Sequence, residues 1–311
     1  MKEILVSVVV VSYNSSEYIL DCLESIKDQD YKNLELIITD DYSQDDTIII
    51  AKYWIANNSD RFINVRIIES SSNTGVAPNC NRGLNLVCGS WAKFIAADDM
   101  LVRPDSITTY VENIPDNEFV CAIFSDIYRL KFDTYTKIIT AYRNLVFSDK
   151  ISAKEQLKII SKENILFAAS AFLNINAICK IGGWDEDINM FEDVTMWNSL
   201  LKFGYIFTYV DEPLVVYRFN TESLTQKGKK KINKELIRQR ILIFEKYKIP
   251  AQSVWYRMYY SICVFILKMV NKSKCDFISR ILLDLHRLIY HAGNKPYFIV
   301  KILINKYHYR K

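Results

Sequence analysis

Three pairs of adjacent carboxylates are the side chains best suited to chemistry in this sequence. They are Asp40-Asp41, Asp98-Asp99 and Glu192-Asp193. The first two directly follow apolar segments, LELIIT and WAKFIAA, and the third precedes a segment with helical periodicity. Neighbouring carboxylates repel each other unless a cation lies between them, and a single carboxylate can take a proton from a reacting hydroxyl. Such pairs could bind a metal ion or act as a base, although any one alone is more typical of a solvated turn or helix cap.

The elements expected in the first hundred residues place two of these pairs together. We expect strands at 4–11, 34–39, 64–69 and 91–97, and helices after Asn14 (capped by it, with Glu17 three residues on), at 45–58 and at 77–87. This alternation predicts a parallel sheet with helices on both faces and a ligand crevice at the carboxyl ends of the strands. Both Asp-Asp pairs then lie on that edge.

The pattern is looser beyond residue 105. We expect short strands within 119–130, a helix at 152–163, a turn at the paired glycines of IGGWDE, a helix at 193–204 and strands at 205–210 and 214–218. From residue 229 onward the apolar spacing predicts amphipathic helices.

Composition limits the class of protein. The chain has 311 residues, half of them hydrophobic, so it can bury a large core. The seven cysteines are scattered without a CxxC pair, which favours reduced thiols in the cytoplasm over a disulfide framework. The apolar N-terminal run favours a buried strand over a signal peptide, and no uninterrupted apolar run reaches the length of a membrane span. We therefore expect a cytoplasmic protein.

Charge is divided unevenly along the chain. Residues 1–221 carry 20 Lys and Arg against 31 Asp and Glu, whereas residues 222–311 carry 20 against 5. This asymmetry predicts a boundary near residue 221. The basic amphipathic helices beyond it fit peripheral docking on anionic lipid at the inner face of the cell membrane. They fit equally well a helical domain that packs on the rest of the chain or on a second copy, as a homodimer. No motif supports nucleic-acid binding.

Four ordered blocks of the sequence resemble glycosyltransferase family 2, whose members have the GT-A fold. The blocks are VSVVVVSYNSSEYILDCLESIKDQDYKNLELIITDDYSQDDT (6–47), NTGVAPNCNRGLNLVCGSWAKFIAADD (73–99), IGGWDEDINMFEDVTMWNSLLKFGY (181–205) and YRFNTESLT (217–225). They cover about two thirds of the chain.

The resemblance implies an α/β fold: a Rossmann-like, mixed nucleotide-binding sheet with helices on both faces and a helical C-terminal extension. It implies a catalytic domain at 1–221, with a nucleotide-sugar-binding half (1–105) and an acceptor-binding half (106–221), followed by a basic helical region at 222–311. The implied activity is inverting, metal-dependent transfer of a sugar, from UDP-hexose or UDP-N-acetylhexosamine, to a saccharide or lipid-linked saccharide. Bacterial members of this size commonly build capsule, O-antigen or other surface polysaccharides.

The resemblance also assigns roles to residues. Asp99 would contact Mn²⁺ or Mg²⁺, Asp193 would be the catalytic base, and either Asp40 or Asp41 would accept the N3–H of uracil. The implied nucleotide-sugar-binding residues are Ser12, Tyr13, Asn14, Asp40, Asp41, Asn73, Gly75, Asn81, Asp98 and Arg218, and the implied acceptor-binding residues are Trp184 and Glu192.

Each role has a structural alternative. Asp193 could simply cap its helix, Arg218 could form an ordinary ion pair, and Trp184 could be a core residue. Among other functions, a dinucleotide-dependent oxidoreductase is disfavoured because SYNSSE stands where GxGxxG would be. A Ser or Cys hydrolase is disfavoured because all three histidines lie in the basic region, far from any candidate nucleophile. A non-catalytic nucleotide-binding or assembly subunit of GT-A fold remains the alternative.

Overall fold

The protein consists of two compact units. A computed structural model describes residues 3–139, 146–161, 165–188, 191–219, 233–273 and 278–290. The first unit comprises Met1–Ile160 and Asn164–Thr221, and the second comprises Ser161–Glu163 and Glu222–Lys311. Each is described by itself.

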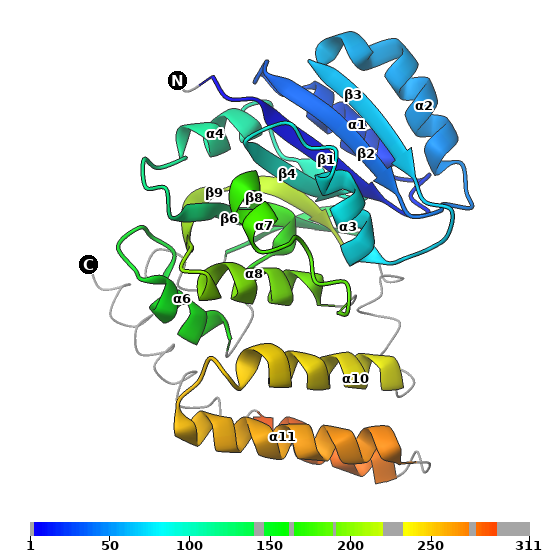
Figure 1. Ribbon diagram of the computed structural model, residues 1–311. Helices are drawn as coiled ribbons and strands as arrows, with labels where there is room; N and C mark the ends of the chain where they lie inside the picture. Colours follow the sequence, from blue (N-terminus) through cyan, green and yellow to red (C-terminus); the bar gives the residue numbers. More distant parts are fainter. Residues whose placement is uncertain are drawn as a thin grey trace. The chain divides into compact units, whose positions relative to one another are not determined.

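A mixed nine-stranded sheet forms the frame of the first unit (Figure 1). Its strands are β1 (Val6–Ser12), β2 (Leu34–Asp40), β3 (Asn64–Glu69), β4 (Trp91–Ala96), β5 (Met100–Leu101), β6 (Val120–Lys131), β7 (Thr134–Ile138), β8 (Phe172–Asn174) and β9 (Ile206–Arg218). They lie in the order β3-β2-β1-β4-β8-β6-β9-β5, with β7 paired to β6. Strands β1 to β4 pair in parallel, whereas β8 is antiparallel to both β4 and β6. The parallel half therefore has one carboxyl edge.

Helices cover both faces of this sheet. They are α1 (Ile19–Lys27), α2 (Thr47–Asn58), α3 (Val76–Leu84), α4 (Ser106–Glu112), α6 (Ala153–Ile160), α7 (Ile175–Lys180) and α8 (Glu192–Lys202), with short 3₁₀ turns at Ser59–Arg61 and Ala168–Ser170. Side chains of α1, α2 and α4 share one buried cluster with Val6, Val8 and Val10 of β1. Those of α3, α6, α7 and α8 form a second cluster, against which Val11 packs. The alternating side chains of buried strands explain the two layers.

Helix α3 lies very close to the sheet. A Cβ atom added to Gly83 would lie 2.7 Å from Cγ1 of Val9 and 3.1 Å from Cγ2 of Thr39. Only a residue without a side chain allows this approach, because real Cβ atoms do not tolerate such distances. The close packing brings the start of α3 to the carboxyl ends of β1 and β2.

The observed elements include β5, β7, β8, α4 and α7, which the sequence analysis did not predict, and they differ from the prediction in two further respects. The segments predicted as separate strands at 205–210 and 214–218 form one strand, β9, and the short strands expected within 119–130 form the single strand β6. The prediction that Asn14 caps the first helix is wrong. Helix α1 begins at Ile19, and Asn14 has a positive φ of 48°. The Asn14 Oδ1 atom instead accepts the backbone N–H of Gln44 (2.8 Å), which ties the end of β1 to the loop after β2.

The second unit is helical where it is described. It contains α10 (Lys234–Ile243), a π-helical turn (Phe244–Lys248), α11 (Val254–Lys272) and helical residues 278–290. Its core is a cluster of apolar side chains that includes Phe244, Tyr260 and Leu267. No helix within the described ranges is long and apolar enough to cross a membrane.

Candidate active site

The register of the parallel strands brings the first two acidic pairs to one edge. Ser12 at the end of β1 pairs with Asp40 at the end of β2, and Val11 pairs with Ala96 at the end of β4. Because parallel strands end together, the residues that follow β2 and β4 extend from the same carboxyl edge. Asp98 and Asp99 come directly after β4 on that edge.

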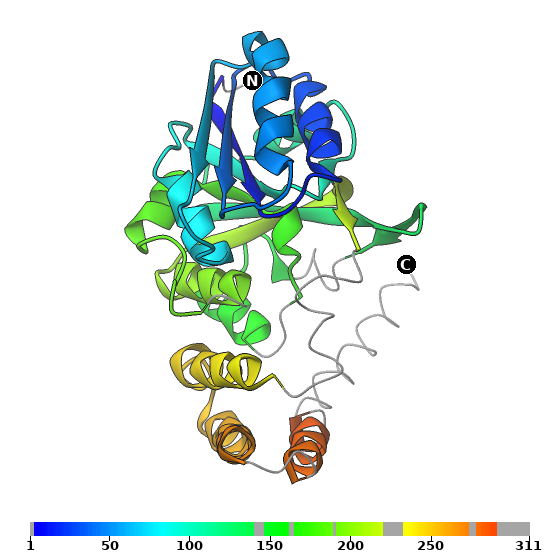
Figure 2. The same ribbon diagram turned by 90° about the vertical axis from the view of Figure 1, so that its right-hand side faces the viewer.

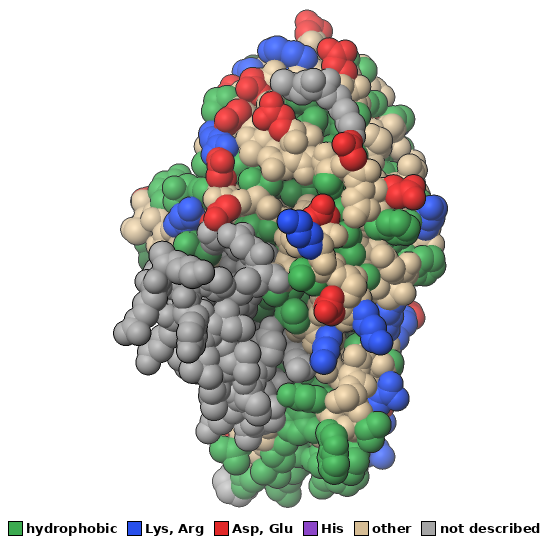
Figure 3. Space-filling model, turned by 90° about the vertical axis from the view of Figure 1, so that its left-hand side faces the viewer, with side chains coloured by type: hydrophobic (Ala, Val, Ile, Leu, Met, Phe, Trp, Pro, Cys, Tyr) green, Lys and Arg blue, Asp and Glu red, His purple; other side chains and the backbone are tan. Residues whose placement is uncertain are grey.

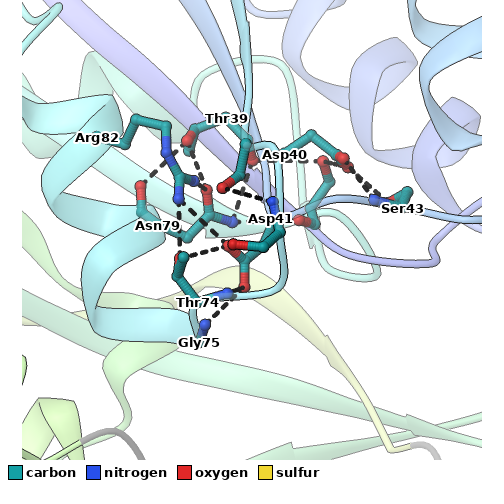
Figure 4. A network of polar contacts seen from close by, with 11 residues as sticks. Thr39, Asp40, Asp41, Ser43, Thr74, Gly75, Asn79 and Arg82 are labelled. Carbon is teal, nitrogen blue, oxygen red and sulfur yellow. Dashed lines mark hydrogen bonds and ion pairs between the residues drawn. The ribbon is translucent and has the colours of Figure 1, made fainter.

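Asp40 is buried and held by serines. Its Oδ1 atom accepts hydrogen bonds from Oγ of Ser12 (2.8 Å) and Oγ of Ser43 (2.6 Å), and its Oδ2 atom accepts the backbone N–H of Ser43 (2.7 Å). The backbone N–H of Asn14 donates in turn to Oγ of Ser43 (2.8 Å). Asp40 therefore orders the loop after β2 against the end of β1 (Figure 4).

Asp41 faces the turn that begins α3. Its carboxylate accepts the backbone N–H groups of Thr74 (2.9 Å) and Gly75 (2.6 Å), the Thr74 hydroxyl (2.6 Å) and Nη2 of Arg82 (3.3 Å). Gly75 has a φ of 96°, a conformation that L side chains rarely adopt, so glycine fits this turn. A carboxylate has about four sites that can accept a hydrogen bond. The four hydrogen bonds to Asp41 occupy about all of them, whereas the three to Asp40 leave about one acceptor site.

Asn79 of α3 completes this network. Its Oδ1 atom accepts the Thr39 hydroxyl (2.6 Å) and Nη1 of Arg82 (2.7 Å), and its Nδ2 atom donates to the backbone oxygens of Ser12 (3.1 Å) and Thr39 (3.2 Å). Figure 4 shows these groups converging from β2, α3 and the loops beside them. The network fixes the ends of β1 and β2 relative to α3.

Asp99 is a buried carboxylate, and Asp98 beside it is half-buried. Burial, followed by the neighbouring charge of Asp98, holds the pKa of Asp99 well above its usual range, while Arg218 lowers it. Burial also raises the pKa of Asp98, and Arg218 opposes this shift. Two adjacent carboxylates, one buried and one half-buried, favour a bound cation, because a cation offsets both the desolvation cost and the repulsion.

A two-residue strand brings Arg218 to this pair. Strand β5 directly follows Asp99 and pairs with β9, with Met100 opposite Val216. The backbone N–H of Arg218 donates to Oδ1 of Asp99 (3.0 Å), and its Nε donates to the backbone oxygen of Asp98 (3.1 Å). Its guanidinium also bonds Oδ2 of Asp21 (2.9 Å) and lies 4.7 Å from the centre of the Tyr18 ring. The guanidinium is close enough to Asp98 and Asp99 for its charge to lower the pKa of each carboxyl.

Glu192 and Asp193 lie in the first turn of α8. Burial, followed by the charge of Asp193, raises the pKa of Glu192 to about 7. The charge of Glu192 raises, after burial, the pKa of Cys80 in α3, so this pair lies near that helix. The backbone N–H of Val194 donates to Oδ1 of Asp193 (2.7 Å). A negative charge at a helix N-terminus is stabilised by the helix dipole.

Helix α3 also holds the loop that precedes α8. Asn81 accepts the backbone N–H of Trp184 through Oδ1 (2.8 Å) and donates to its backbone oxygen through Nδ2 (3.0 Å). The Trp184 ring packs 4.6 Å from that of Phe94 in β4 and is 7% exposed. α3 thus contacts both the first acidic network and the segment that leads to Asp193.

A comparison of the sequence with family models decides the family. The model described as Glycosyl transferase family 2 matches residues 7–174, more than half of the chain. The chain belongs to glycosyltransferase family 2. The match includes β1 to β4 and both Asp-Asp pairs.

Relatives and solved structures agree with this family. Over 224 residues the transferase is 28% identical to TuaG of Bacillus subtilis, which is named as a teichuronic acid biosynthesis glycosyltransferase; the alignment covers 71% of this chain and 81% of that protein. The fold is similar to that of S. aureus TarS 1–349, solved with UDP-GlcNAc (TM-score 0.62, 14% identity, 86% and 72% of the chains). It is also similar to that of the mannosyltransferase PcManGT from Pyrobaculum calidifontis, solved with GDP-Man and Mn²⁺ (TM-score 0.55, 16% identity, 98% and 88%). The predicted GT-A fold, a mixed sheet with helices on both faces and C-terminal helices, is confirmed.

The transferase places its predicted site residues in three groups. One group, at the ends of β1 and β2 and the start of α3, holds Ser12, Asn14, Asp40, Asp41 and Gly75, with exposed Tyr13 and Asn73 beside them in sequence. The second holds Asp98, Asp99 and Arg218. The third holds Asn81, Trp184, Glu192 and Asp193 at α3 and α8. The roles proposed for all of them stay predictions.

Several residues of the site were not foreseen in the sequence. Arg82 bonds Asp41, and Tyr18 and Asp21 contact Arg218, but all three depend on tertiary contacts. Lys93 is fully buried in β4 and its Nζ donates to the backbone oxygens of Ala169 and Ala171. Burial lowers the pKa of Lys93 to about 7, although Asp99 raises it. The sequence signal for this buried charge was the presence of a lysine inside the apolar run WAKFIAA.

Proposed function

We propose that the protein transfers a sugar from a UDP-linked donor, UDP-hexose or UDP-N-acetylhexosamine, to a saccharide or lipid-linked saccharide acceptor during synthesis of a bacterial surface polysaccharide. The acidic groups at one edge of a GT-A sheet support the proposal that the donor is a nucleotide sugar. The name of TuaG supports a role in polysaccharide synthesis, and the TarS structure with UDP-GlcNAc supports uridine as the nucleoside of the donor. We also propose that the protein works in the cytoplasm, at the inner face of the membrane.

The adjacent carboxylates of half-buried Asp98 and buried Asp99 are the observation that carries this proposal. Mg²⁺ and Mn²⁺ prefer oxygen ligands, and Mg²⁺ in particular is commonly held by one or two carboxylates together with substrate phosphates and water. No three His, Cys, Asp or Glu side chains within the described part of the chain are arranged to hold a metal ion. This donor set therefore fits a cation that is shared with a bound diphosphate. When bound, the cation would neutralise the charge that develops on the departing diphosphate.

The protein's own groups would hold the donor around Asp99. We assign the metal contact to Asp99 and place Asp98 nearer the ribose or sugar. The guanidinium of Arg218, beside both, is positioned to bind phosphate oxygens if it leaves Asp21. We assign the nucleotide to the group that contains Ser12, Tyr13, Asn14, Asp40, Asp41, Asn73 and Gly75, with Asn81 holding α3 against the loop before α8.

Asp193 would act as the base. Its carboxylate takes the proton of the acceptor hydroxyl as that oxygen forms a bond to the anomeric carbon. The bond from this carbon to the diphosphate oxygen breaks on the opposite face, and its electron pair leaves with the nucleotide. A single displacement of this kind inverts the anomeric configuration. Glu192 and Trp184 would border the acceptor, although Trp184 is only 7% exposed.

A ligand screen tests the donor. The melting temperature is measured with UDP-, GDP-, CMP- and dTDP-sugars, each with and without Mn²⁺, because a ligand of the native state alone raises it. We expect the largest rise with a UDP-sugar and Mn²⁺. Release of UDP in the presence of a lipid-linked saccharide then distinguishes a transferase from a non-catalytic nucleotide-binding subunit, which would bind the donor and leave it intact.

A further inference from the structure

Helix α11 exposes a continuous apolar stripe. Trp255, Met258, Ile262, Phe265 and Met269 recur at alternating spacings of three and four residues, and each is exposed, from 44% for Met269 to 80% for Trp255. The opposite side of the same helix is buried in the core of the C-terminal unit through Tyr260, Cys263 and Leu267. The stripe is therefore separate from the face that stabilises the unit.

The helical residues 278–290 continue this surface. Ile278, Ile281, Leu285 and Leu288 follow the same spacing and are 43% to 70% exposed. The hydroxyl of Tyr259 in α11 donates to the backbone oxygen of Ile289 (2.6 Å), so the two helices contact each other. On each helix the exposed stripe borders the side that makes this contact. We call the two stripes together the C-terminal apolar face. Figure 2 shows the two helices side by side.

Basic side chains border the C-terminal apolar face on both outer sides. Lys268 and Lys272 are exposed on the polar side of α11, and Arg280 and Arg287 are exposed on the polar side of 278–290. Two acidic residues moderate this charge: Lys268 forms an ion pair with Glu245 (2.7 Å) and Arg287 with Asp284 (3.2 Å). In Figure 3, hydrophobic side chains gather at the lower end of the view, with Lys and Arg side chains nearby.

We propose that the C-terminal apolar face docks on an anionic lipid bilayer. An apolar surface between two basic borders matches the boundary between acyl chains and anionic headgroups, where long cationic side chains reach the phosphates. A second copy that presented the same face would bring like charges together along both borders, so charge favours lipid over a homodimer. This inference names the residues that would mediate the membrane association proposed above. It does not depend on the transferase activity.

Sedimentation of the full chain with vesicles tests this proposal. We compare phosphatidylcholine vesicles with vesicles that also contain about 30% phosphatidylglycerol. The protein should sediment with the anionic vesicles, far less with the neutral ones, and less at high salt. The double variant Phe265→Ser/Leu288→Ser should lower the partition coefficient by about tenfold or more. Lys272→Gln/Arg280→Gln should lower it by on the order of tenfold, on anionic vesicles only.

The matched control removes two equally exposed apolar side chains elsewhere. Ile49→Ser/Tyr53→Ser lies on α2 of the first unit, where these residues are 68% and 76% exposed, and it should bind vesicles like the wild type. Quenching of Trp255 fluorescence by brominated lipid, lost in Trp255→Phe, should report contact directly. Equal loss of vesicle binding in Phe265→Ser/Leu288→Ser and in the control Ile49→Ser/Tyr53→Ser, or no vesicle binding by the wild type, overturns the proposal. So does a dimer in sedimentation velocity that Phe265→Ser/Leu288→Ser dissociates while vesicle binding stays unchanged.

Discussion

The backbone N–H of Arg218 donates a hydrogen bond to Oδ1 of Asp99 over 3.0 Å, although 119 residues separate the two in sequence. The contact exists because β5, only two residues long, pairs with the end of β9 immediately after Asp99. This pairing aligns the acidic end of β4 with a cationic side chain from the far part of the sheet. The proposed diphosphate site thus joins both halves of the GT-A sheet.

Replacement of Arg218 tests its role toward phosphate. Arg218→Gln should lower UDP affinity by about tenfold or more, because a hydrogen bond between charged groups contributes about 1.5–3 kcal/mol. Asp21→Asn is the matched control, since it removes the ion-pair partner and leaves the guanidinium free. It should keep or increase the affinity in isothermal titration. If both variants lose only thermal stability and neither loses UDP affinity, Arg218 is merely an ion-paired residue.

The two candidates for uracil recognition can be separated by base preference. Uracil N3 donates a hydrogen bond, whereas cytosine N3 accepts one, so an aspartate that contacts N3 selects UDP over CDP. Of Asp40→Asn and Asp41→Asn, one should reduce the ratio of UDP to CDP affinity and the other should keep it. Asn cannot accept all the hydrogen bonds made to Asp41, so the substitution at this position also tests the stability of the fold. Melting curves without nucleotide therefore show whether each variant is folded. An unchanged ratio in two folded variants would place the base elsewhere.

Asp193→Asn should separate binding from catalysis. The amide keeps the shape of the side chain but cannot take the proton of the acceptor, so transfer should fall by about 10² or more while donor affinity stays within about twofold. The measurement is initial rate of UDP release alongside titration with UDP. Glu192→Gln, at the neighbouring position assigned to the acceptor, should raise the KM for the acceptor but retain far more of the transfer rate at saturating acceptor than Asp193→Asn. Full turnover by Asp193→Asn would remove it as the base.

Glu192 should make stability depend on pH. Its pKa is raised to about 7 by burial and by Asp193, against about 4.3 in an unfolded chain. The folded state therefore binds more protons in this window, and stability falls as pH rises from about 4.3 to 7. The melting temperature of Glu192→Gln minus that of the wild type should increase over this range and stay level above it. A flat difference from pH 4 to 8 would contradict the raised pKa.

The sequence predicted the parallel half of the sheet well. Strands β1 to β4 are recognisable because each β-branched or apolar run ends at polar residues, and this alternation with helices requires a common carboxyl edge. The end positions of the runs also located Asp40 and Asp98 on that edge. Local patterns were sufficient there because each element is continuous in sequence.

The contacts around the site could not be predicted in the same way. β5 is too short to carry a pattern, so the sequence around Asp99 does not predict its hydrogen bond with Arg218; only the family resemblance placed Arg218 in the site. The hydrogen bonds from Thr74 and Gly75 to the Asp41 carboxylate require α3 to lie close to β2. This close approach depends on tertiary packing at Gly83, which a local sequence pattern does not show. The cap predicted at Asn14 failed because its side chain bonds the Gln44 backbone in another loop instead.

The most direct test of the account is the effect of Mn²⁺ on UDP affinity, measured by isothermal titration in the wild type and in Asp99→Asn. We predict that Mn²⁺ raises the affinity of the wild type for UDP by about tenfold or more, because the cation would link the carboxylates of Asp98 and Asp99 to the diphosphate. In Asp99→Asn, with an unchanged fold by circular dichroism, Mn²⁺ should have little effect. An equal gain from Mn²⁺ in both proteins would contradict the central claim.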